Sequence, residues 1–516
     1  MQIAAVHIDL KGVLFRPEYM PQLFEDLASQ RINAVLVEYE DVFPFQCVDV
    51  AWDKAASWTL ETLRAFQSAA AENGIEIIPL QQCLGHLEYL FRWPAYRHLA
   101  EDPSVGTTVC PTNLEATSVV ASMLREVLET HPDSKYVHLG MDEADSLVTS
   151  ERVRQRGGPL PVFLEHLRGL CDIVESYGKT PIIWSDMLED HFEPDAFAEF
   201  TSRVVLAPWD YTSGTEPMKR IRLAGHRVMR DSVAANADAL LVEDLPANVL
   251  ALIEPDMEDG GLKSLFQVDL WTRLGFRVIG GTVLRFSAQG PILPDYNQNR
   301  ENITAWANAI DRTDQLGLIA TSWARANTFY PPNLRIDLTW PLVAEFAQAA
   351  GRKPEPFWPG VPTDDASRIV RSLGRCRSNN LSKELALAEE MALLADQVGA
   401  HRFEWTSTEL MARALHLAKK AQRCVGATEP FVSGARLIES EWERRIAELA
   451  SVVTELTQLR DTVHEHFGQR FAGSAYDEWL HYVFDWPREC LETRADLCRR
   501  RQAEAKQAYT REQTGQ

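Results

Sequence analysis

Short apolar runs rich in β-formers alternate with amphipathic stretches through the first two thirds of this 516-residue chain. Eight runs are predicted as strands: Ile3–Leu10, Ala34–Glu38, Ile75–Leu80, Tyr136–Gly140, Pro181–Trp184, Val204–Pro208, Val278–Leu284 and Leu318–Trp323. The stretches between them with helical periodicity include Met20–Gln30, Leu60–Asn73, Glu115–Thr130, Val162–Tyr177 and Ile303–Asp311. A strand followed by a helix, repeated eight times, predicts parallel strands joined by helical crossovers.

Residues 1–350 are therefore predicted to form an α/β fold of the (β/α)8 TIM-barrel type. Continuous apolar runs such as AVLV suit a sheet that is buried on both faces. Eight strand–helix units in roughly 340 residues fit such a barrel with insertions. A doubly wound open sheet is the alternative. The stretch around residues 212–275 exceeds one ordinary crossover, so we expect an insertion there.

The last third of the chain is predicted to be all helical. A segment dense in Pro and Gly, Gly351–Thr363, precedes it, so residues 364–516 are expected to form a C-terminal helical domain. Within Glu441–His464 apolar residues recur with a seven-residue period, which predicts a coiled-coil-like seam. The seam consists of Leu449, Val452, Leu456, Leu459 and Val463. It packs either inside a helical bundle or against a second copy, so a homodimer through these helices stays open.

The net charge of −22 lies almost entirely in the first part of the chain. Residues 1–350 hold 28 Lys+Arg and 49 Asp+Glu, whereas residues 351–516 hold 24 and 25. An acidic surface repels phosphate backbones, so no nucleic-acid partner is expected. No window approaches about 18 consecutive apolar residues, so no membrane span is expected either.

The N-terminus and the cysteines favour a cytoplasmic location. The sequence MQIAAVHIDLKG has no charged leader and no long apolar region, and it is typical of a strand, so no secretory signal is expected. The eight cysteines are scattered without a CxxC pair, which is typical of buried thiols in a reducing compartment.

Two adjacent carboxylates, Asp142 and Glu143, follow the fourth predicted strand in YVHLGMDEAD. In a parallel barrel the functional residues lie where strands end, because the loops there surround the mouth. Adjacent carboxylates raise each other's pKa. Glycoside hydrolysis uses this effect, since one carboxyl must stay protonated near neutral pH to donate to a leaving oxygen. The pair is thus a candidate catalytic centre, and an ordinary surface Asp-Glu pair is the alternative.

Tryptophan occurs at three other predicted strand ends. Trp184 ends the fifth strand, Trp209 follows the sixth and Trp323 ends the eighth. One such residue is usually part of a core, but three on different strands predict an aromatic cage around a ring-shaped ligand. Sugar rings suit such a cage, because their C–H faces pack on aromatic faces while their hydroxyls need polar partners.

The motif HLGMDEAD resembles the His-x-Gly-x-Asp-Glu signature of glycoside hydrolase family 20, the β-N-acetylhexosaminidases. The stretches HIDLKG, VEYEDVFPF, PLQQCLGHLEYL, IIWSDML and PWDYT are more closely similar to the intracellular hexosaminidase D type of that family. The resemblance covers residues 5–211 and returns at Gly317–Arg325. It implies a TIM barrel that needs no cofactor. It also implies an exo-acting enzyme that removes terminal β-linked GlcNAc or GalNAc from an oligosaccharide or glycoconjugate.

The same resemblance implies a retaining, substrate-assisted mechanism, in which the 2-acetamido oxygen attacks the anomeric carbon and gives an oxazolinium-like intermediate. Glu143 would be the general acid and later the base that activates water. Asp142 would accept a hydrogen bond from the acetamido N–H, and Tyr211 would donate one to the acetamido oxygen. Because these contacts would hold the acetamido oxygen close to the anomeric carbon, the reaction would avoid most of its entropic barrier, which would supply much of the rate gain.

Further residues follow from the resemblance. Glu40 and His86 match the positions of an acidic residue and a histidine that assist the acid/base glutamate. The three tryptophans would wall the pocket around the sugar. His138, four residues before Asp142, is expected to be a structural hydrogen-bonding group beneath the site.

Three positions depart from the family pattern, at residues that would contact the outer sugar hydroxyls. Secreted members have an arginine near the first strand end, where the nearest basic residue here is Lys11. They carry Tyr two residues before an Asp that holds the 4-hydroxyl, whereas the order here is Asp210-Tyr211. Two residues after the last Trp they place a glutamate, where this chain has Arg325. Lys11, Asp210 and Arg325 are still predicted to bind substrate. Arg325 is expected to pair with Asp210 or another local carboxylate, or else to meet an anionic substituent.

Two other functions remain open. His7-Ile8-Asp9 resembles half of a strand-one metal motif that His86 and Asp186 would complete, but the remaining histidines do not cluster at strand ends, so no metal is expected. The second is a non-catalytic glycan-binding or scaffold protein on the same barrel, with the helical region as its working part.

Overall fold

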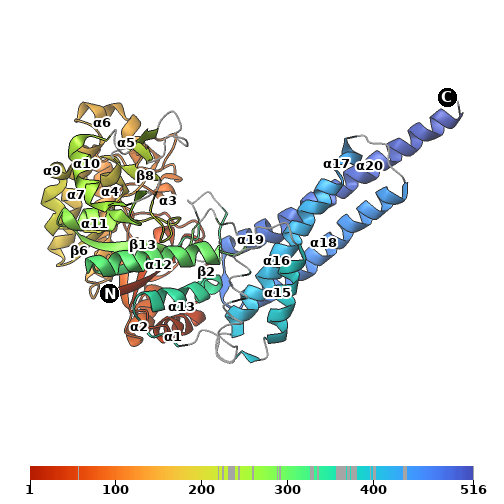
Figure 1. Cartoon of the computed structure of the whole chain (residues 1–516), viewed down its shortest axis with the longest axis horizontal. Helices are drawn as coiled ribbons and strands as arrows, with labels where there is room; N and C mark the ends of the chain where they lie inside the picture. Colours follow the sequence, from red (N-terminus) through yellow and green to blue (C-terminus); the bar gives the residue numbers. More distant parts are fainter. Residues whose placement is uncertain are drawn as a thin grey trace.

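A computed structural model describes the chain as a barrel followed by an arm of helices that reaches away from it (Figure 1). The described residues are 1–516 apart from 56, 219, 224–225, 230–238, 242–244, 259–260, 287–288, 290–291, 326–330, 334–335, 356–367, 369–371, 373–380, 395–396, 399–401, 434–438 and 515–516. Most of the predicted loop Gly351–Thr363, the expected start of the helical domain at 364 and Cys376 lie outside them.

Eight parallel strands close the barrel in the order β1-β14-β13-β7-β6-β5-β4-β3, and β1 pairs with both β14 and β3. Their bounds are β1 (Ile3–Asp9), β3 (Ala34–Glu38), β4 (Glu76–Leu80), β5 (Tyr136–His138), β6 (Thr180–Trp184), β7 (Val205–Ala207), β13 (Arg277–Arg285) and β14 (Gly317–Ser322). Each predicted strand overlaps one of them. The predicted barrel is therefore confirmed, and the open doubly wound sheet is not what forms.

Alternate residues of each strand serve two apolar layers. On β1, Ile3 and Ala5 point into the barrel interior, while Ala4, Val6 and Ile8 pack in the shell beneath the helices. Both sets are buried, which explains why the strand sequences are apolar without alternation.

Helices surround the barrel as the crossovers between strands (Figure 1). The longer ones are α1 (Met20–Ser29), α2 (Leu60–Glu72), α4 (Leu114–Thr130), α7 (Pro159–Ser176), α11 (Phe266–Arg273), α12 (Tyr296–Thr313) and α13 (Trp340–Ala349). The shorter elements of the loops are β2 (Leu14–Phe15), η1 (Pro17–Tyr19), η2 (Glu40–Val42), α3 (Glu88–Phe91), η3 (Arg97–Leu99), α5 (Ser146–Thr149), α6 (Glu151–Gln155), α8 (Asp186–Asp190), α9 (Pro194–Phe197), η4 (Ala198–Ser202) and η9 (Ile336–Leu338). Thr59 and Asn113 begin α2 and α4, since each side chain accepts a hydrogen bond from an amide of the first turn.

Between β7 and β13 the chain makes a long excursion, where the sequence predicted an insertion. Its described elements are β8 (Arg220–Leu223), β9 (His226–Met229), β10 (Ala239–Leu241), α10 (Ala247–Ile253), η7 (Glu254–Asp256), β11 (Met257–Glu258) and β12 (Gly261–Leu262). The first three strands form a small sheet in the order β10-β9-β8, and β11 and β12 form a hairpin.

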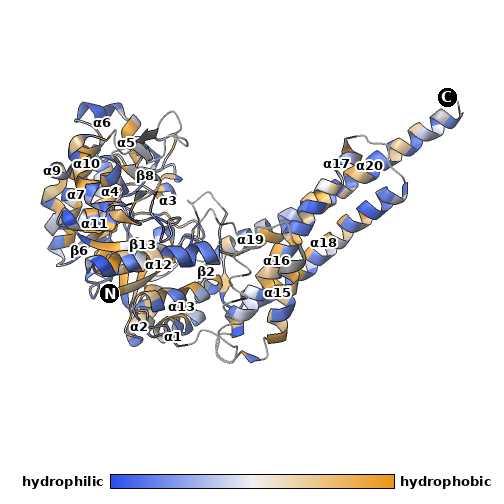
Figure 2. Cartoon of the chain, in the orientation of Figure 1, coloured by the Kyte–Doolittle hydropathy of each residue, from blue (hydrophilic) through white to orange (hydrophobic). Residues whose placement is uncertain are grey.

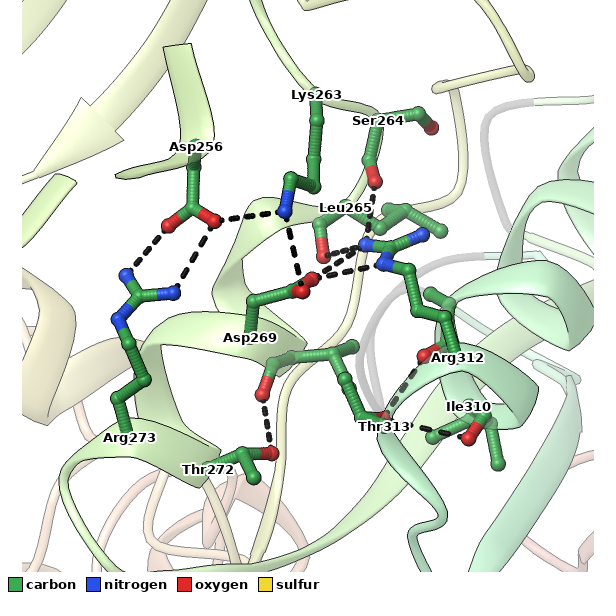
Figure 3. Close-up of polar contacts among 12 residues, drawn as sticks. Asp256, Lys263, Ser264, Leu265, Asp269, Thr272, Arg273, Ile310, Arg312 and Thr313 are labelled. Atoms are coloured by element: carbon green, nitrogen blue, oxygen red, sulfur yellow. Dashed lines mark hydrogen bonds and ion pairs between the residues drawn. The ribbon is translucent and has the colours of Figure 1, made fainter. Parts of the chain in front are cut away.

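A network of ion pairs fixes the end of this excursion on the barrel helices (Figure 3). The buried carboxylate of Asp256 lies 2.5 Å from Arg273 and 3.1 Å from Lys263. Lys263 also lies 3.3 Å from Asp269 of α11, which pairs with Arg312 of α12 at 2.6 Å. Because a buried charge is stable only when paired, these contacts hold the hairpin, α11 and α12 in one arrangement.

The arm contains the helical elements of the last third. They are α15 (Leu381–Leu394), α16 (Arg402–Ala427), α17 (Glu429–Val432), α18 (Glu439–Phe467), α19 (Ser474–Leu480), the π-helical turn η11 (His481–Asp485) and α20 (Trp486–Thr514). Helices α16, α18 and α20 pack side by side, and the C-terminus lies at the far end of the arm (Figure 1). No helix in the described part of the chain is long and apolar enough to span a bilayer.

The predicted seam faces the interior of this arm. Its five residues on α18 are all buried, and α18 packs against α16 and α20. The polar and apolar colours that mix along each arm helix in Figure 2 are typical of helices that bury one stripe. The seam is thus used within one chain, as in a helical bundle.

Several contacts join the arm to the mouth of the barrel. Strand β2, just after β1, pairs antiparallel with β15 (Phe471–Ala472). Arg470 beside it lies 2.7 Å from the carboxylate of Asp337 and 2.9 Å from the hydroxyl of Tyr19, and it also pairs with Glu404. These contacts bring α19 next to the strand ends.

Candidate active site

All eight barrel strands contribute to a pocket of about 140 Å³ at the mouth. Its lining consists of Lys11, Glu38, His86, Asp142, Glu143, Trp184, Trp209, Tyr211, Phe286, Trp323 and Arg325. Each residue lies at the end of a strand or shortly after it, and parallel strands end at the same side of a barrel. Of the twelve residues predicted for the site, nine line the pocket. The exceptions are Glu40, His138 and Asp210.

His86 lies between the two acidic residues of the motif. Its Nε2 atom is 3.2 Å from Asp142 Oδ2 and 3.3 Å from Glu143 Oε2. Burial alone would lower the pKa of His86, but the attraction of Asp142 and hydrogen bonds to both carboxylates raise it well above its ordinary value. The imidazole is therefore a cation at neutral pH that ties Asp142 to Glu143. The side chain of Asp142 is only 9% exposed, whereas that of Glu143 is 54% exposed.

One carboxylate oxygen of Asp142 has no partner among the residues that the structure describes. Oδ2 faces His86, while Oδ1 is buried and accepts no hydrogen bond. An unmet buried acceptor costs about 1 to 3 kcal/mol, so it usually marks a place for a ligand or water. Because Asp142 lines the pocket, this unmet acceptor lies in the pocket wall. The buried indole N–H of Trp184 is likewise an unmet donor in the pocket wall.

Backbone strain concentrates around this centre. Glu40, His86, Met141 and Glu143 all have a positive φ, at 47°, 54°, 76° and 46°. A non-glycine residue in this region costs on the order of 1 kcal/mol or more, and such residues cluster at functional sites. The strain fits a loop arrangement that serves a ligand rather than the stability of the fold.

Two glycines explain how the loops after β4 and β5 approach so closely. A Cβ at Gly140 would lie 1.8 Å from Gln82 Oε1, and the φ of Gly140 is 67°. A Cβ at Gly85 would lie 2.0 Å from the carbonyl oxygen of Asp142. Any larger residue would therefore push His86 away from the carboxylates.

Aromatic side chains wall the other side of the pocket. Trp184 and Trp323 have ring centroids 6.2 Å apart, and Trp209 stacks on Tyr211 at 5.3 Å. The indole N–H of Trp323 donates to the Tyr211 hydroxyl at 3.0 Å. Burial raises the pKa of Tyr211 well above its usual value, so the hydroxyl keeps its proton and can donate a hydrogen bond to a ligand.

Asp186, at the start of α8, supports this wall from behind. Its Oδ2 accepts from the backbone N–H of Glu143 at 2.9 Å, and its Oδ1 accepts from the indole of Trp209 at 3.4 Å. Burial and the nearby Asp142 raise the pKa of Asp186 well above its ordinary value. The sequence indicated Asp186 only as a metal ligand. Its position in IIWSD, two residues after a Trp at a strand end, was the available signal for a positioning role.

Lys11 and Glu38 form a buried ion cluster in the pocket wall at the ends of β1 and β3. The Lys11 ammonium lies 2.7 Å from Glu38 and 3.0 Å from Asp9, and 4.8 Å from the ring centre of Trp323. Burial would lower the pKa of Lys11, but the two carboxylates raise it above its usual range. Lys11 is thus a permanent cation whose charge the protein itself neutralises. Sequence reasoning missed Glu38, which reads simply as the last residue of a buried strand.

Glu40 and His138 lie near the pocket without lining it. The Oε2 atom of Glu40 is buried and has no partner in the described part of the chain, and burial raises the pKa of this carboxyl well above its ordinary value. His138 Nδ1 accepts from the N–H of Gly140 at 3.0 Å, and its ring lies 4.3 Å from that of Trp184. Burial lowers the pKa of His138 to about 3, so the ring is neutral and supports the site from beneath.

Asp210 and Arg325 have partners that the sequence did not indicate. The carboxylate of Asp210 accepts from the N–H groups of Thr212 and Ser213, both at 2.7 Å, and closes its own loop. Arg325 does not pair with Asp210. Its Nε donates to the carbonyl of Lys11 at 2.8 Å, and Nη2 lies 2.8 Å from Glu478 of α19. The arm therefore contributes to the edge of the pocket.

The residues of the alternative metal site do not come together. Asp9 binds Lys11 and the N–H of Ala324, while His86 binds the two carboxylates of the motif. Across the described ranges no group of three or more His, Cys, Asp or Glu side chains has the arrangement of a metal site.

Part of the chain is similar to proteins of a known family. Residues 20–237 match the sequence profile of the catalytic domain of glycosyl hydrolase family 20. Hexosaminidase D of Homo sapiens is 30% identical over 230 residues, which are 43% of this chain and 47% of that protein. Hexosaminidase D of Bos taurus is 28% identical over 214 residues, 40% of this chain and 62% of that protein. The chain thus matches only about half of the length of these relatives.

Solved structures with a similar course of the chain include β-N-acetylhexosaminidases from two bacteria. The enzyme from Bacteroides fragilis has a TM-score of 0.46 at 16% identity and covers 75% of this chain and 71% of its own. The family 20 enzyme from Streptomyces coelicolor has a TM-score of 0.44 at 15% identity, with 72% and 67% covered. The match of the family profile confirms the resemblance seen in the sequence: residues 20–237 are similar to the catalytic domain of glycosyl hydrolase family 20.

Proposed function

We propose that the pocket is the active site of an exo-β-N-acetylhexosaminidase, a glycoside hydrolase that removes terminal β-linked GlcNAc or GalNAc with retention of configuration. The observation that carries the proposal is the placement of Asp142 and Glu143 together in one aromatic pocket, where Asp142 has a buried oxygen with an unmet acceptor and the carboxyl group of Glu143 is exposed. An acetamido N–H is the kind of donor that this oxygen lacks.

In the proposed reaction the substrate's own acetamido group is the nucleophile. Asp142 accepts the acetamido N–H and Tyr211 donates to the acetamido oxygen, so the oxygen is held against the anomeric carbon. As the bond from this oxygen to C1 forms, positive charge develops on the acetamido nitrogen, next to the carboxylate of Asp142. Holding the two reacting atoms in place removes much of the entropic barrier, and the fixed negative charge stabilises the transition state.

Glu143 is the general acid and then the general base, on the other side of C1. Its carboxyl donates a proton to the glycosidic oxygen as the C1–O bond breaks, and the aglycone leaves as an alcohol. The resulting carboxylate is stabilised by His86, 3.3 Å away, and then takes a proton from the water that attacks C1. The bond between C1 and the acetamido oxygen breaks in this second step, which restores the acetamide and the acid form of Glu143.

The decisive experiment assays nitrophenyl β-N-acetylglucosaminide and β-N-acetylgalactosaminide with the wild type and Glu143→Gln. We expect hydrolysis by the wild type and a loss of about 100-fold to 10,000-fold in Glu143→Gln. Glu115→Gln, an exposed carboxyl at the start of α4, is the matched control and should keep full activity. Equal rates for the wild type and Glu143→Gln, or no hydrolysis by the wild type, would reject the proposal. The second outcome would favour the non-catalytic alternative.

Two further proposals concern the whole protein. We propose a cytoplasmic location, supported by the free thiols of the seven described cysteines. A homodimer through the C-terminal helices is also proposed, with faces of α18 and α20 other than the buried seam as its contact. Sedimentation of the full chain tests it, and a monomeric mass at micromolar concentration would reject it.

A further inference from the structure

A cluster of buried charges lies in the joint between the barrel and the arm. We call it the joint cluster, and it consists of Tyr19, Asp26, Asp337, Glu404 and Arg470. The guanidinium of Arg470 is at its centre, 2.7 Å from Asp337 and 2.9 Å from the Tyr19 hydroxyl, and it also pairs with Glu404. The first three residues belong to η1, α1 and η9 of the barrel, whereas Glu404 belongs to α16 of the arm and Arg470 precedes β15. The joint cluster therefore bridges the two parts of the chain.

The joint cluster holds more acidic groups than basic ones. Its carboxyl groups, on Asp26, Asp337 and Glu404, are all buried, and each is close enough to Arg470 or to the other carboxyls to interact with them. One guanidinium neutralises one carboxylate, so ionisation of all three would leave two buried negative charges in excess. Such charges are costly away from water, and a bound proton removes the cost.

Asp26 is the member of the joint cluster that changes its charge near neutral pH. Burial raises its pKa to about 7 and the nearby Glu404 adds to the shift, while a hydrogen bond from Gln22 and the attraction of Arg470 oppose it. Burial likewise raises the pKa of Asp337 to about 6 against the attraction of Arg470. Each carboxyl is thus easier to protonate when the arm is docked than when water surrounds it.

Two other titratable groups near Arg470 keep one charge state across this range. Burial raises the pKa of Tyr19 well above its ordinary value, so the phenol stays neutral. His466 of α18 stacks on Phe403, whose ring lies under the Arg470 guanidinium, and burial lowers the pKa of this histidine to about 4. The imidazole is therefore neutral as well, and it does not offset the carboxylates.

The arm also holds the loop that carries Lys11 into the pocket wall. Strand β2 in this loop pairs with β15, and the backbone N–H of Arg16 donates to the carbonyl of Arg470 at 2.7 Å. The carbonyl of Lys11 itself accepts from Arg325, which pairs with Glu478 of α19. Firm docking of the arm thus fixes the loop after β1.

We propose that the joint cluster is a proton-dependent latch between the arm and the barrel. With a proton on Asp26 the arm docks firmly and holds the loop after β1. When Asp26 ionises, the excess negative charge weakens the docking and loosens the loop that carries Lys11. A carboxyl whose pKa is raised by docking stabilises the docked state fully below its free value of about 3.9, and this contribution is lost as the pH rises through about 7.

Hydrogen exchange of the full chain, followed by mass spectrometry at pH 6 and pH 8, measures the docking. After correction for intrinsic exchange rates, the opening constant of the amides in β2 and β15 should be about tenfold larger at pH 8, as one carboxyl with a pKa of about 7 predicts. The amides that pair β3 with β4 inside the barrel should keep their protection. Equal opening constants at the two pH values, or an equal change in β3 and β4, would overturn the proposal.

Asp26→Asn separates the latch from other effects of pH. An amide has the shape of the protonated carboxyl and no charge, so the opening constant of β2 and β15 should match the wild type at pH 6. At pH 8 it should be about tenfold smaller than in the wild type, a gain in protection that misfolding cannot produce. Glu18→Gln, an exposed carboxyl on η1, is the matched control and should behave as the wild type. No gain in Asp26→Asn at pH 8, or an equal gain in Glu18→Gln, would contradict the latch.

A consequence for the pocket rests on the proposed function. Because a loose loop would displace Lys11, the KM for nitrophenyl β-N-acetylglucosaminide at pH 8 should be lower in Asp26→Asn than in the wild type, with equal values at pH 6. Equal KM values at pH 8 would overturn the link between the latch and the pocket. Hydrolysis by neither protein would instead reject the proposed function, while the exchange experiment would still decide on the latch.

Discussion

The two opposite walls of the active pocket differ in how far their polar groups are satisfied. At the end of β5, Asp142 has a buried oxygen without a partner and Glu143 is half exposed on a strained backbone. At the ends of β1 and β14, by contrast, Lys11 binds two carboxylates and Arg325 binds Glu478. Unmet polar groups and backbone strain lower the stability of the fold and are typical of a site that binds a ligand. Paired charges avoid the cost of an unmet buried charge, so they stabilise the part of the barrel in which they lie. The first wall is therefore built for chemistry and the second for support.

The support wall should show the largest effect on stability. Lys11→Met leaves Asp9 and Glu38 buried without their cation, so we expect the free energy of unfolding to fall by about 3 to 5 kcal/mol. Urea unfolding monitored by tryptophan fluorescence measures this loss. Asp142→Asn, at the chemical wall, is the comparison and should cost less, about 1 to 2 kcal/mol, because it loses the ion pair with His86 but already has an unmet oxygen. If both variants lost equal stability, the distinction between the walls would be lost.

The chemical wall should show the reverse pattern in activity. Asp142→Asn keeps the shape but replaces the charge that would face the acetamido nitrogen, so kcat should fall by about 100-fold to 1,000-fold. Asp210→Asn is the matched control, because that carboxylate closes its own loop and should change kcat only a few-fold. Steady-state assays on the nitrophenyl glycoside compare the two. An equally large loss in Asp210→Asn would place Asp210 at the sugar and contradict its position here.

His86 links activity to pH at the chemical wall. Its pKa is raised in the folded protein, so its contribution to stability is complete below the unfolded value of about 6.5 and declines as pH rises toward the folded value. The difference in unfolding free energy between the wild type and His86→Asn should therefore shrink from pH 6 to pH 9. His86→Asn should also lower kcat by about tenfold to 100-fold. A difference that grows with pH would mean that the histidine is neutral.

The contact between the arm and the support wall should have the smallest effect. Glu478 is 45% exposed, so its pair with Arg325 is screened by water. A double-mutant cycle of Arg325→Gln and Glu478→Gln should give a coupling of at most about 1 kcal/mol. A coupling of several kcal/mol would instead make this pair a main link between barrel and arm.

Sequence reasoning reached the barrel and most of the pocket because both depend on local signals. Runs such as Ala34–Glu38 are apolar throughout, since both faces of each strand are buried. Once the strands are known, their ends must meet, so Asp142, Trp184 and Trp323 could be assigned to one mouth before any distance was known. The family resemblance added His86 and Tyr211.

Two residues that sequence reasoning misplaced or missed, Arg325 and Glu38, depend on contacts between distant segments. Arg325 pairs with Glu478, 153 residues later, and no local pattern indicates that α19 docks at the mouth. Asp210 turned out to bind its own loop, as Asp residues often do when nearby N–H groups are free. Glu38 has no signal of its own, because its role depends on Lys11 lying 2.7 Å away on the neighbouring strand end.

The central claim is that the substrate's acetamido group performs the attack while Asp142 and Tyr211 hold it. The most direct measurement compares nitrophenyl β-glycosides whose acetamido group carries zero, one, two or three fluorine atoms. Fluorine withdraws electrons from the acetamido oxygen, so log kcat/KM should fall steeply with each atom in the wild type. Rates that do not depend on fluorination would mean that another nucleophile attacks C1, and the assignment of Asp142 and Tyr211 would then be wrong.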